Sequence, residues 1–355
     1  MELLIYLILF LLVLIVSSTT NKLLPFLPLP LVQILLGIVI GLFLPNTDFH
    51  LNTELFLALV IGPLLFRESE EADITAILKH WRIIIYLIFP VIFISTLSLG
   101  GLAHLLWFSL PLAACLAVGA ALGPTDLVAF ASLSERFSFP KRVSNILKGE
   151  GLLNDASGLV AFQVALTAWT TGAFSLGQAS SSLIFSILGG FLIGFLTAMT
   201  NRFLHTFLLS VRATDIASEL LLELSLPLVT FFLAEEVHVS GIIAVVVAGI
   251  LKASRFKKIT LLEAQVDTVT ETVWHTVNFM LNGSVFVILG MELEMIAEPI
   301  LTNPIYNPLL LLLSLVALTF VLFAIRFVMI YGYYAYRTRR LKKKLNKYMK
   351  DMLLL

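Results

Sequence analysis

The sequence predicts an all-α protein that crosses a membrane about eleven times, and three observations lead to this fold class. First, 59% of the 355 residues are hydrophobic and only 13% are charged, whereas soluble globular chains carry about 25% charged residues. Second, apolar runs long enough to span a bilayer recur along the whole chain. Third, the basic residues are confined to alternate connecting segments. The spans must be helical, because lipid offers no partner for backbone polar groups.

A membrane span needs about 20 mainly apolar residues. We expect spans at 3–18, 25–44, 53–66, 82–107, 111–133, 146–169, 182–204, 216–235, 238–251, 270–296 and 307–335. The third range is short, and only a brief acidic stretch separates the eighth range from the ninth. The first range follows no basic segment and precedes no small-residue cleavage site, so we interpret it as a retained span rather than a signal peptide.

The Lys and Arg residues predict the orientation of the chain. All 23 of them except Arg326 lie in, or within about a residue of, segments on one side of the membrane if the N-terminus is outside. These segments are 19–24, 67–81, 134–148, 202–215, 252–269 and the part after 335. We therefore expect a multi-pass protein of the cell membrane, with an outside N-terminus and residue 355 on the cytoplasmic side.

The spans also divide the chain, since the pattern shows no soluble domain. We expect spans 1 to 4 in 1–110, core spans 5 to 7 with an ion site in 111–204, spans 8 to 10 in 205–306, span 11 with Arg326 in 307–336, and a basic cytoplasmic segment followed by the start of another span in 337–355. The basic segment resembles a topology anchor beside anionic membrane lipid.

Composition excludes several classes of partner. The formal net charge is zero, so we expect no nucleic acid partner. The sequence contains no phosphate-binding glycine loop, so we expect no nucleotide and no transport driven directly by ATP. The single cysteine, Cys115, cannot form a disulfide within the chain, and a cysteine-based zinc site is excluded.

Ionisable residues within spans indicate function, because each costs about 2.5–3.5 kcal/mol to insert. Asp126, Glu150, Asp155 and Arg326 are the four that stand out.

The first of these follows a predicted helix break. Gly123 and Pro124 precede Thr125 and Asp126 in the fifth span. Pro124 removes a helix hydrogen bond and Gly123 adds backbone freedom. Broken helices of this kind form ion sites in transporters. The alternative is a simple kink that Asp126 caps.

The sixth span carries two carboxylates that should have different roles. Glu150 shares a helix stripe with Asn154, four residues on, and points about 140° away from Asp155. Arg326 is the only cation within a span that could partner Glu150, and a buried pair is tolerated better than either charge alone.

Asp155 shares the other stripe with Gly151 and Gly158. We expect these two glycines to leave room for an ion, Na⁺, and its water.

Two further acidic stretches have weaker signals. We expect residues 68–73 to form a solvated loop, with Glu68 as a possible entry residue facing an inner vestibule. Asp215, Glu219 and Glu223 are spaced four residues apart and so form one stripe along a helix. It is interpreted as a polar helix face or, through Glu219, as a second part of a cation entry path.

Taken in order, several motifs resemble the bacterial monovalent cation:proton antiporter-1 family, which includes sodium/proton exchangers. The matching stretches are PLPLVQILLGIVIG (28–41), GPTDLVAFASL (123–133), EGLLNDASGLVAF (150–162), AEEVHVSGIIAVVVAGI (234–250), NGSVFVILGMEL (282–293) and the apolar helix around Arg326.

The resemblance implies a thirteen-span fold with inverted repeats, built from a dimerisation domain and a moving core domain, and therefore a homodimer. It implies that Asp155 is the cation and proton site and that Asn154 belongs to an Asn-Asp pair. Thr125 and Asp126 would contribute from the unwound helix, and Glu150 and Arg326 would form the core ion pair.

Two departures from the family follow from the sequence. Gly151 stands where the family usually has Ser, so water would replace a hydroxyl ligand. The family's spans after the Arg326 helix are absent, and we expect the chain to be a C-terminally truncated fragment.

The function expected from these residues is secondary active exchange of Na⁺ for H⁺. Deprotonated Asp155 would bind Na⁺ and protonated Asp155 would not, and burial favours the protonated form enough for competition near neutral pH. With one titrating carboxylate the exchange should be electroneutral. The alternatives are a K⁺ or Li⁺/H⁺ antiporter of the same fold, a cation channel and, least favoured, an intramembrane aspartyl enzyme. We expect no enzymatic activity and no cofactor besides the transported ions.

Overall fold

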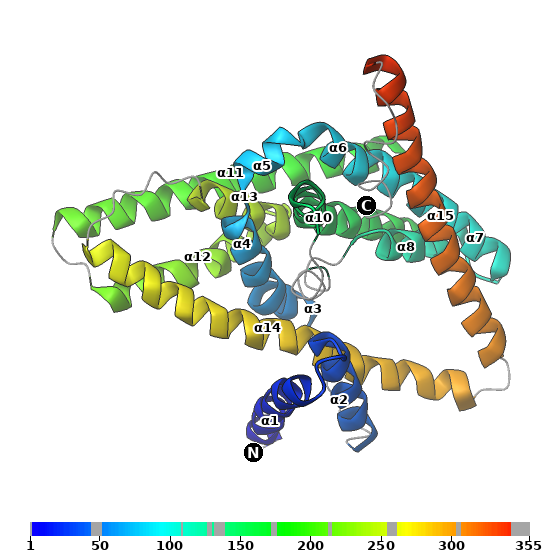
Figure 1. Ribbon diagram of the computed structural model, residues 1–355, viewed down its shortest axis with the longest axis horizontal. Coiled ribbons are helices and arrows are strands. Elements are labelled where there is room, and N and C mark those ends of the chain that lie inside the picture. The colour runs from blue at the N-terminus through cyan, green and yellow to red at the C-terminus, as the bar shows by residue number, and fades with distance from the viewer. Residues whose placement is uncertain are drawn as a thin grey trace. The chain divides into compact units, whose positions relative to one another are not determined.

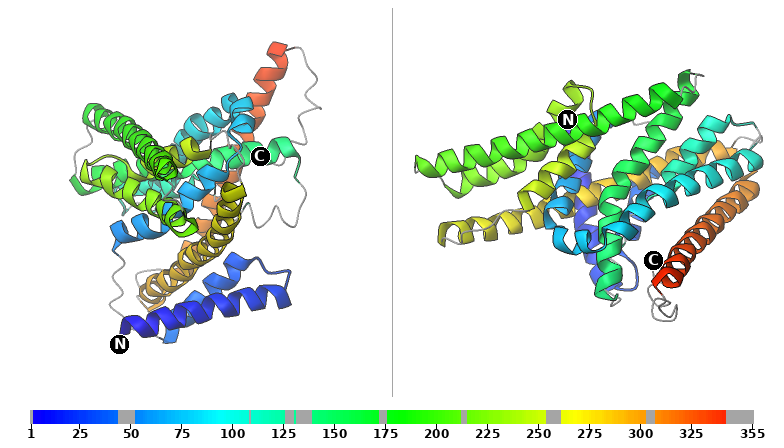
Figure 2. Two further views of the ribbon diagram at one scale, coloured as in Figure 1. Left: turned by 90° about the vertical axis from the view of Figure 1, so that its left-hand side faces the viewer. Right: turned by 90° about the horizontal axis from the view of Figure 1, so that it is seen from above.

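The computed structural model describes residues 2–43, 52–107, 109–125, 130, 139–171, 176–211, 215–253, 261–302 and 307–341. Helices make up nearly all of these residues, and no strand occurs among them (Figures 1 and 2). The all-α prediction is thus confirmed for the described part of the chain. The chain divides into two compact units.

Unit 1 comprises residues 1–71 and 185–305. Its elements are α1 (Glu2–Leu23), α2 (Leu29–Phe43), α3 (Thr53–Phe56), the π-helical turn η1 (Leu57–Ile61), α4 (Gly62–Glu71), α11 (Leu176–Ser210, from Phe185 onward), α12 (Ile216–Glu236), α13 (Gly241–Ala253) and α14 (Leu261–Thr302).

Unit 2 comprises residues 72–184 and 306–355. Its elements are α5 (Ile74–Lys79), α6 (Trp81–Tyr86), the π-helical turn η2 (Leu87–Val91), α7 (Ile92–Leu106), α8 (Leu112–Leu122), α10 (Lys141–Thr171), α15 (Pro308–Leu341) and the beginning of α11.

Prolines account for the two π-helical turns. Pro90 lies within η2, and Pro63 lies two residues after η1. A proline has no N–H to donate, so the hydrogen-bond ladder shifts locally by one residue instead of breaking. As a result, α3, η1 and α4 form one continuous helix, as do α6, η2 and α7. The weak third span therefore continues as helix to Glu71.

Glycines allow the closest helix packing within unit 1. A Cβ atom on Gly37 of α2 would collide with the Val287 carbonyl of α14, and one on Gly290 of α14 would collide with the Ile34 carbonyl of α2. The two backbones therefore touch, as small residues permit in membrane helices.

The boundary between the eighth and ninth predicted spans is a tight turn. His238 adopts a left-handed backbone conformation with φ of 58°. The Val239 N–H then donates to the Ala234 carbonyl at 3.0 Å, which closes α12. Glu235 Oε1 accepts from the Gly241 N–H at 3.2 Å and so caps α13. The prediction of two separate helices here is confirmed.

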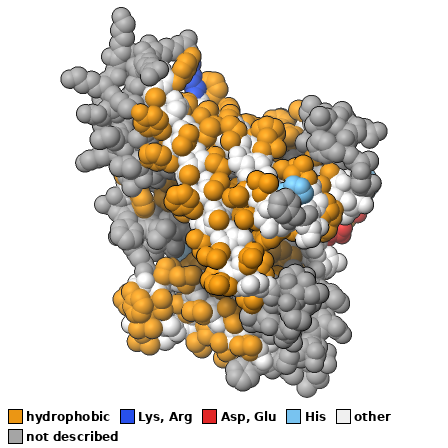
Figure 3. Space-filling view, turned by 90° about the vertical axis from the view of Figure 1, so that its right-hand side faces the viewer, with side chains coloured by type: hydrophobic (Ala, Val, Ile, Leu, Met, Phe, Trp, Pro, Cys, Tyr) orange, Lys and Arg blue, Asp and Glu red, His pale blue; other side chains and the backbone are white. Residues whose placement is uncertain are grey.

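The surface is that of a multi-pass membrane protein. Within the described ranges, five helices are long and apolar enough to cross a membrane: Trp81–Leu106, Phe185–Ser210, Ile216–Glu236, Thr268–Ala297 and Pro308–Arg337. Large apolar side chains stay exposed along them, such as Phe320 and Phe323 of α15 at 73% and 66%. Figure 3 shows one face on which hydrophobic side chains far outnumber charged ones. Each of the eleven expected ranges contains helix, but the count of eleven spans remains a prediction.

Candidate ion-binding site

The site begins at the break after α8 in unit 2. This helix ends at Leu122. Its C-cap, Gly123, still has helical dihedral angles, φ of −70° and ψ of −43°, but Gly123, Pro124 and Thr125 belong to no helix. The fifth predicted span is therefore interrupted, and the interruption places the Thr125 side chain beside other helices. Asp126 lies outside the described residues.

On α10, Glu150 and Asn154 lie one turn apart and are almost completely buried. The Asn154 side-chain nitrogen donates to Glu150 Oε1 at 3.5 Å. The 3.6-residue helical repeat accounts for this contact, since residues four apart share a face.

Arg326, near the middle of α15, makes the shortest contacts of the site. Its Nη2 atom donates to both carboxylate oxygens of Glu150, at 2.8 Å to Oε1 and 2.7 Å to Oε2. Its Nη1 atom donates to Thr125 Oγ1 at 2.8 Å, and the Thr125 hydroxyl donates in turn to Glu150 Oε1 at 3.2 Å. Three distant parts of the chain thus meet in what we call the Arg326 group: Thr125, Glu150, Asn154 and Arg326.

The charges of the Arg326 group balance each other. Glu150 is only 1% exposed, and a carboxylate so deeply buried would be very costly without a cation. The guanidinium and the donors of Thr125 and Asn154 surround it. All of the contacts that the described residues make with the Glu150 carboxylate are thus donor contacts.

One buried polar atom of the Arg326 group has no hydrogen-bond partner among the residues that the structure describes. Asn154 Oδ1 is buried and accepts no hydrogen bond within the described part of the chain. Buried polar atoms in native structures nearly always have partners. A carbonyl-type oxygen is a suitable ligand for a hard cation.

Gly158 does not serve the purpose that the sequence suggested. Gly158 was expected to leave open space for an ion, but a Cβ atom there would collide with the Pro124 ring. That expectation was wrong, because the space beside Gly158 is already filled by the broken helix. Gly158 instead lets α10 pack directly against the break. Position 155 lies one turn earlier on α10, and its side chain is outside what the structure describes.

The two expected entry residues belong to unit 1. Glu219 of α12 lies with its Oε2 atom 3.3 Å from His205 Nε2 of α11. Glu68 is half-buried in α4. Residues 68–71 are thus helical, which corrects the prediction of a solvated loop.

Unit 1 contains another group of largely buried charged side chains, which we did not predict from the sequence. Lys252 Nζ of α13 lies 2.9 Å from Glu223 Oε1 of α12 and 3.3 Å from Glu70 Oε1 of α4. Glu223 Oε1 also accepts from Trp274 Nε1 of α14 at 3.0 Å. We call this group the Lys252 cluster, and its members are Arg67, Glu70, Glu71, Glu223, Lys252 and Trp274.

Arg67 completes the Lys252 cluster on α4. It pairs with Glu70 at 3.0 Å and Glu71 at 2.6 Å. Burial acts to lower the pKa of Arg67, but Glu71 and Glu70 together raise it above its usual value. The signal available in the sequence was Glu223, a carboxylate well inside a predicted span, which we had interpreted as part of a polar face.

An ion pair beside a broken helix, within a bundle of membrane helices, is an arrangement found in secondary transporters. The chain belongs to the sodium/hydrogen exchanger family, because the family model described as "Sodium/hydrogen exchanger, transmembrane" matches residues 7–346. The family resemblance inferred from the motifs is confirmed.

Curated relatives are similar over nearly the whole chain. The "Sodium, potassium, lithium and rubidium/H(+) antiporter" of Bacillus pumilus is 36% identical over 95% of this chain and 50% of its own length. The Bacillus subtilis protein of the same name is 36% identical over 88% of this chain and 47% of its own. An uncharacterized Na⁺/H⁺ exchanger of Escherichia coli is 30% identical over 97% and 64%. The chain spans about half the length of the Bacillus relatives.

A solved structure shares the fold. The sodium proton antiporter of Methanocaldococcus jannaschii at pH 8 has a TM-score of 0.63 and 19% sequence identity, covering 82% of this chain and 71% of that one. This structural similarity shows that the all-α chain has the fold of that antiporter.

Proposed function

We propose that the protein exchanges a monovalent cation, Na⁺ first, for H⁺ by competition at Asp155. The observation that carries the proposal is the Arg326 group, in which both oxygens of Glu150 accept from Arg326 while the buried Asn154 Oδ1 accepts no hydrogen bond from any residue that the structure describes. Asp155 is the next residue of α10, and it remains as the carboxylate to titrate. Family membership supports the same reaction.

The expected chemistry uses few groups. When Asp155 is deprotonated, its carboxylate, Asn154 Oδ1 and water would coordinate the cation, since hard cations prefer oxygen ligands. When Asp155 is protonated, the site would lose its charge and the cation would leave. Thr125 was expected to be a direct ligand, but its hydroxyl already donates to Glu150 and accepts from Arg326. We therefore assign Thr125 mainly to positioning the break.

The division into two units suggests how the ion site moves between the two sides of the membrane. Thr125, Glu150, Asn154, Asp155 and Arg326 all belong to unit 2. We assign unit 2 the role of the moving core of an alternating-access cycle and unit 1 that of the dimerisation domain of a homodimer. The N-terminus would face outside, with the basic segment after α15 at the cytoplasmic face of the cell membrane.

The names of the Bacillus relatives favour a second form of the proposal. Both are described as antiporters for sodium, potassium, lithium and rubidium. A site with few protein ligands and Gly151 in place of a hydroxyl residue would rely on water, which discriminates weakly among monovalent cations. K⁺ and Li⁺ are therefore the further candidate substrates.

Asp155→Asn tests the assignment of the carboxylate. An amide cannot release a proton, so cation-dependent recovery of a pH-sensitive dye in proteoliposomes should disappear for the full-length protein. Asp215→Asn makes the same change at an exposed helix cap, where Asn also caps well, and should exchange normally. Exchange retained by a correctly inserted Asp155→Asn protein would refute the role of Asp155.

Imposing a membrane potential tests electroneutrality. One titrating carboxylate exchanges one H⁺ for one monovalent cation, so no net charge should cross the membrane in a cycle. Na⁺-driven proton movement should then be the same with and without a valinomycin potential, after K⁺ itself has been assayed as a substrate. Clear acceleration or reversal by the potential would require a second proton carrier.

A further inference from the structure

We propose that a basic cleft in unit 2 binds the phosphate group of an anionic phospholipid. The cleft has a volume of about 270 Å³, and its lining residues are Lys79, His80, Trp81, Arg82, Ile83 and Arg337. One water takes up about 30 Å³ of liquid, so the cleft has room for a phosphate group with part of its glycerol. It is separate from the Arg326 group.

Three basic side chains of the cleft have no acidic partner in the described part of the chain. Lys79, Arg82 and Arg337 form no ion pair with any residue that the structure describes. Arg67 and Lys252, in contrast, are each paired with two carboxylates. Three cations that converge on one cavity, with no carboxylate paired to them among the described residues, create a potential that favours an anion.

The position of the cleft in the membrane selects the kind of anion. Trp81 begins the apolar helix Trp81–Leu106, and Arg337 ends the apolar helix Pro308–Arg337. The cleft therefore lies where two spans leave the hydrocarbon, at the depth of the lipid headgroups. Trp81 is 49% exposed, and tryptophan is enriched at this interface. Basic side chains here would meet phosphates of the lipid leaflet before any dissolved anion.

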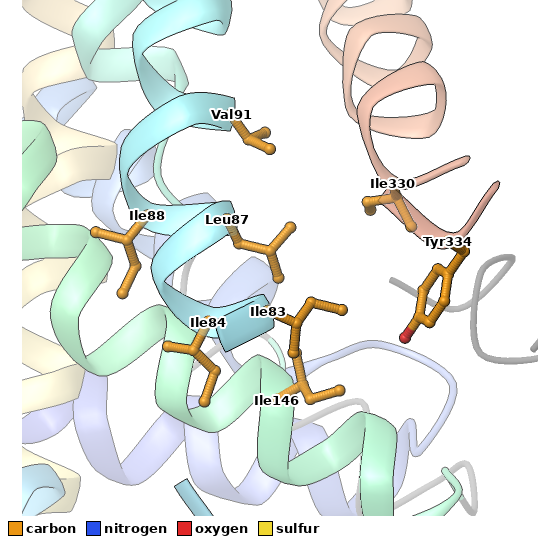
Figure 4. Packing of buried hydrophobic residues seen from close by; sticks show 8 residues of the cluster. All are labelled: Ile83, Ile84, Leu87, Ile88, Val91, Ile146, Ile330 and Tyr334. Atoms are coloured by element: carbon orange, nitrogen blue, oxygen red, sulfur yellow. The ribbon is translucent and has the colours of Figure 1, made fainter. Parts of the chain in front are cut away.

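The two span ends are held together beneath the cleft. Ile83, Ile84 and Leu87 of α6 and η2 form a buried cluster with Ile330 and Tyr334 of α15, as Figure 4 shows.

Polar and aromatic contacts fix the basic groups further. The Tyr86 hydroxyl donates to the Met329 carbonyl at 3.1 Å. Arg337 Nη1 donates to the Tyr333 hydroxyl at 3.5 Å, and the Arg82 guanidinium lies 5.5 Å from the centre of the Trp81 ring. The contacts of Arg82 and Arg337 favour particular side-chain conformations, which reduces the side-chain entropy lost when a phosphate binds.

Lipid retention by the purified full-length protein tests the proposal. Native mass spectrometry would compare phosphatidylglycerol with phosphatidylcholine, which carries the same phosphate but no net charge. The unchanged protein should retain phosphatidylglycerol preferentially. Arg82→Gln with Arg337→Gln should weaken that retention roughly 30-fold, which corresponds to about 2 kcal/mol at 1.4 kcal/mol per tenfold.

A matched control removes the same charge elsewhere. Lys22→Gln with Lys141→Gln neutralises two exposed basic residues outside the cleft and should leave retention unchanged. Arg82→Lys with Arg337→Lys keeps the charge and should retain most of the binding, which separates loss of charge from misfolding.

The remaining outcomes decide against the proposal. Equal retention of the two lipids, or phosphatidylglycerol retention by the Gln double variant equal to that of the unchanged protein, would overturn it. Displacement of phosphatidylglycerol by millimolar inorganic phosphate would show that the cleft binds free phosphate, and the lipid assignment would then be wrong. Each of these readouts is independent of exchange activity.

Discussion

Unit 1 and unit 2 each bury a group of charged side chains, but the two groups are built differently. The Arg326 group contains one carboxylate and one guanidinium in the middle of helices. The Lys252 cluster contains three carboxylates and two cations, and Lys252 and Glu71 lie at the ends of α13 and α4. Glu71 is 57% exposed, whereas Glu150 is 1% exposed.

This difference indicates how each group tolerates its charge. A cluster near helix ends has several alternative partners and some water, so no single pair carries the whole compensation. For Glu150, Arg326 is the one cation at ion-pair distance among the residues that the structure describes, so replacing Arg326 removes that compensation. The Arg326 group should therefore respond to a single substitution far more strongly than the Lys252 cluster.

The largest expected effect comes from breaking the Glu150–Arg326 pair. Arg326→Ala or Glu150→Gln leaves one partner buried without compensation, and each should destabilise the protein by about 3–5 kcal/mol. The double substitution should cost much less than the sum of the two. Melting temperatures in detergent for the four proteins of this double-mutant cycle would measure the coupling. Strictly additive losses would contradict a direct pair.

A smaller effect is expected for Lys252→Met, which keeps the length of the side chain but removes its charge. Glu70 would retain Arg67, and Glu223 would retain the Trp274 N–H, so the expected cost is about 1–3 kcal/mol. Adding Glu223→Gln should restore part of the stability, because one of the two facing carboxylates is then neutral. The melting temperature measures both changes.

One result would contradict this difference between the Arg326 group and the Lys252 cluster. If Lys252→Met destabilised the protein as much as Arg326→Ala, the additional partners of the Lys252 cluster would carry no weight. Exchange should persist in Lys252→Met, since the proposed site lies in unit 2.

The comparison also shows which features of the molecule could be predicted from sequence. The all-helical fold and the ranges that contain helix follow from apolar length, and the contact between Glu150 and Arg326 was anticipated because so few charges lie within spans. The break at Pro124 was likewise visible, since proline removes a backbone donor.

Other features depend on which neighbour fills a given space, and one chain's pattern does not specify this. Gly158 was predicted to leave space for an ion because glycine has no side chain, yet the Pro124 ring fills that space. Glu70 was assigned to a loop because acidic residues near a span end are usually solvated. Its burial depends on Lys252, which is far away in the sequence and is brought close only by the packing of α13 against α4.

The smallest effect concerns Asp215, which caps α12. Its Oδ1 accepts from the Ser218 N–H at 2.8 Å, and the Asp215 N–H donates to Ser218 Oγ at 3.3 Å. Hydrogen bonds from the side chain and then the backbone of Ser218 lower the pKa of Asp215 below its ordinary value of 3.8. The folded state therefore favours the ionised form, and the stabilisation is fully present above that ordinary value.

As the pH falls through the lowered pKa of the folded state, the stabilisation by Asp215 is lost. Asp215→Ala should thus speed hydrogen exchange in the first turn of α12 at pH 7, and the difference from the unchanged protein should shrink at pH 3. Asp215→Asn retains a cap that does not titrate, so its protection, corrected for intrinsic exchange rates, should vary less with pH. If the difference in hydrogen exchange between the unchanged protein and Asp215→Ala stayed constant from pH 7 to pH 3, the carboxylate charge would not contribute to the cap.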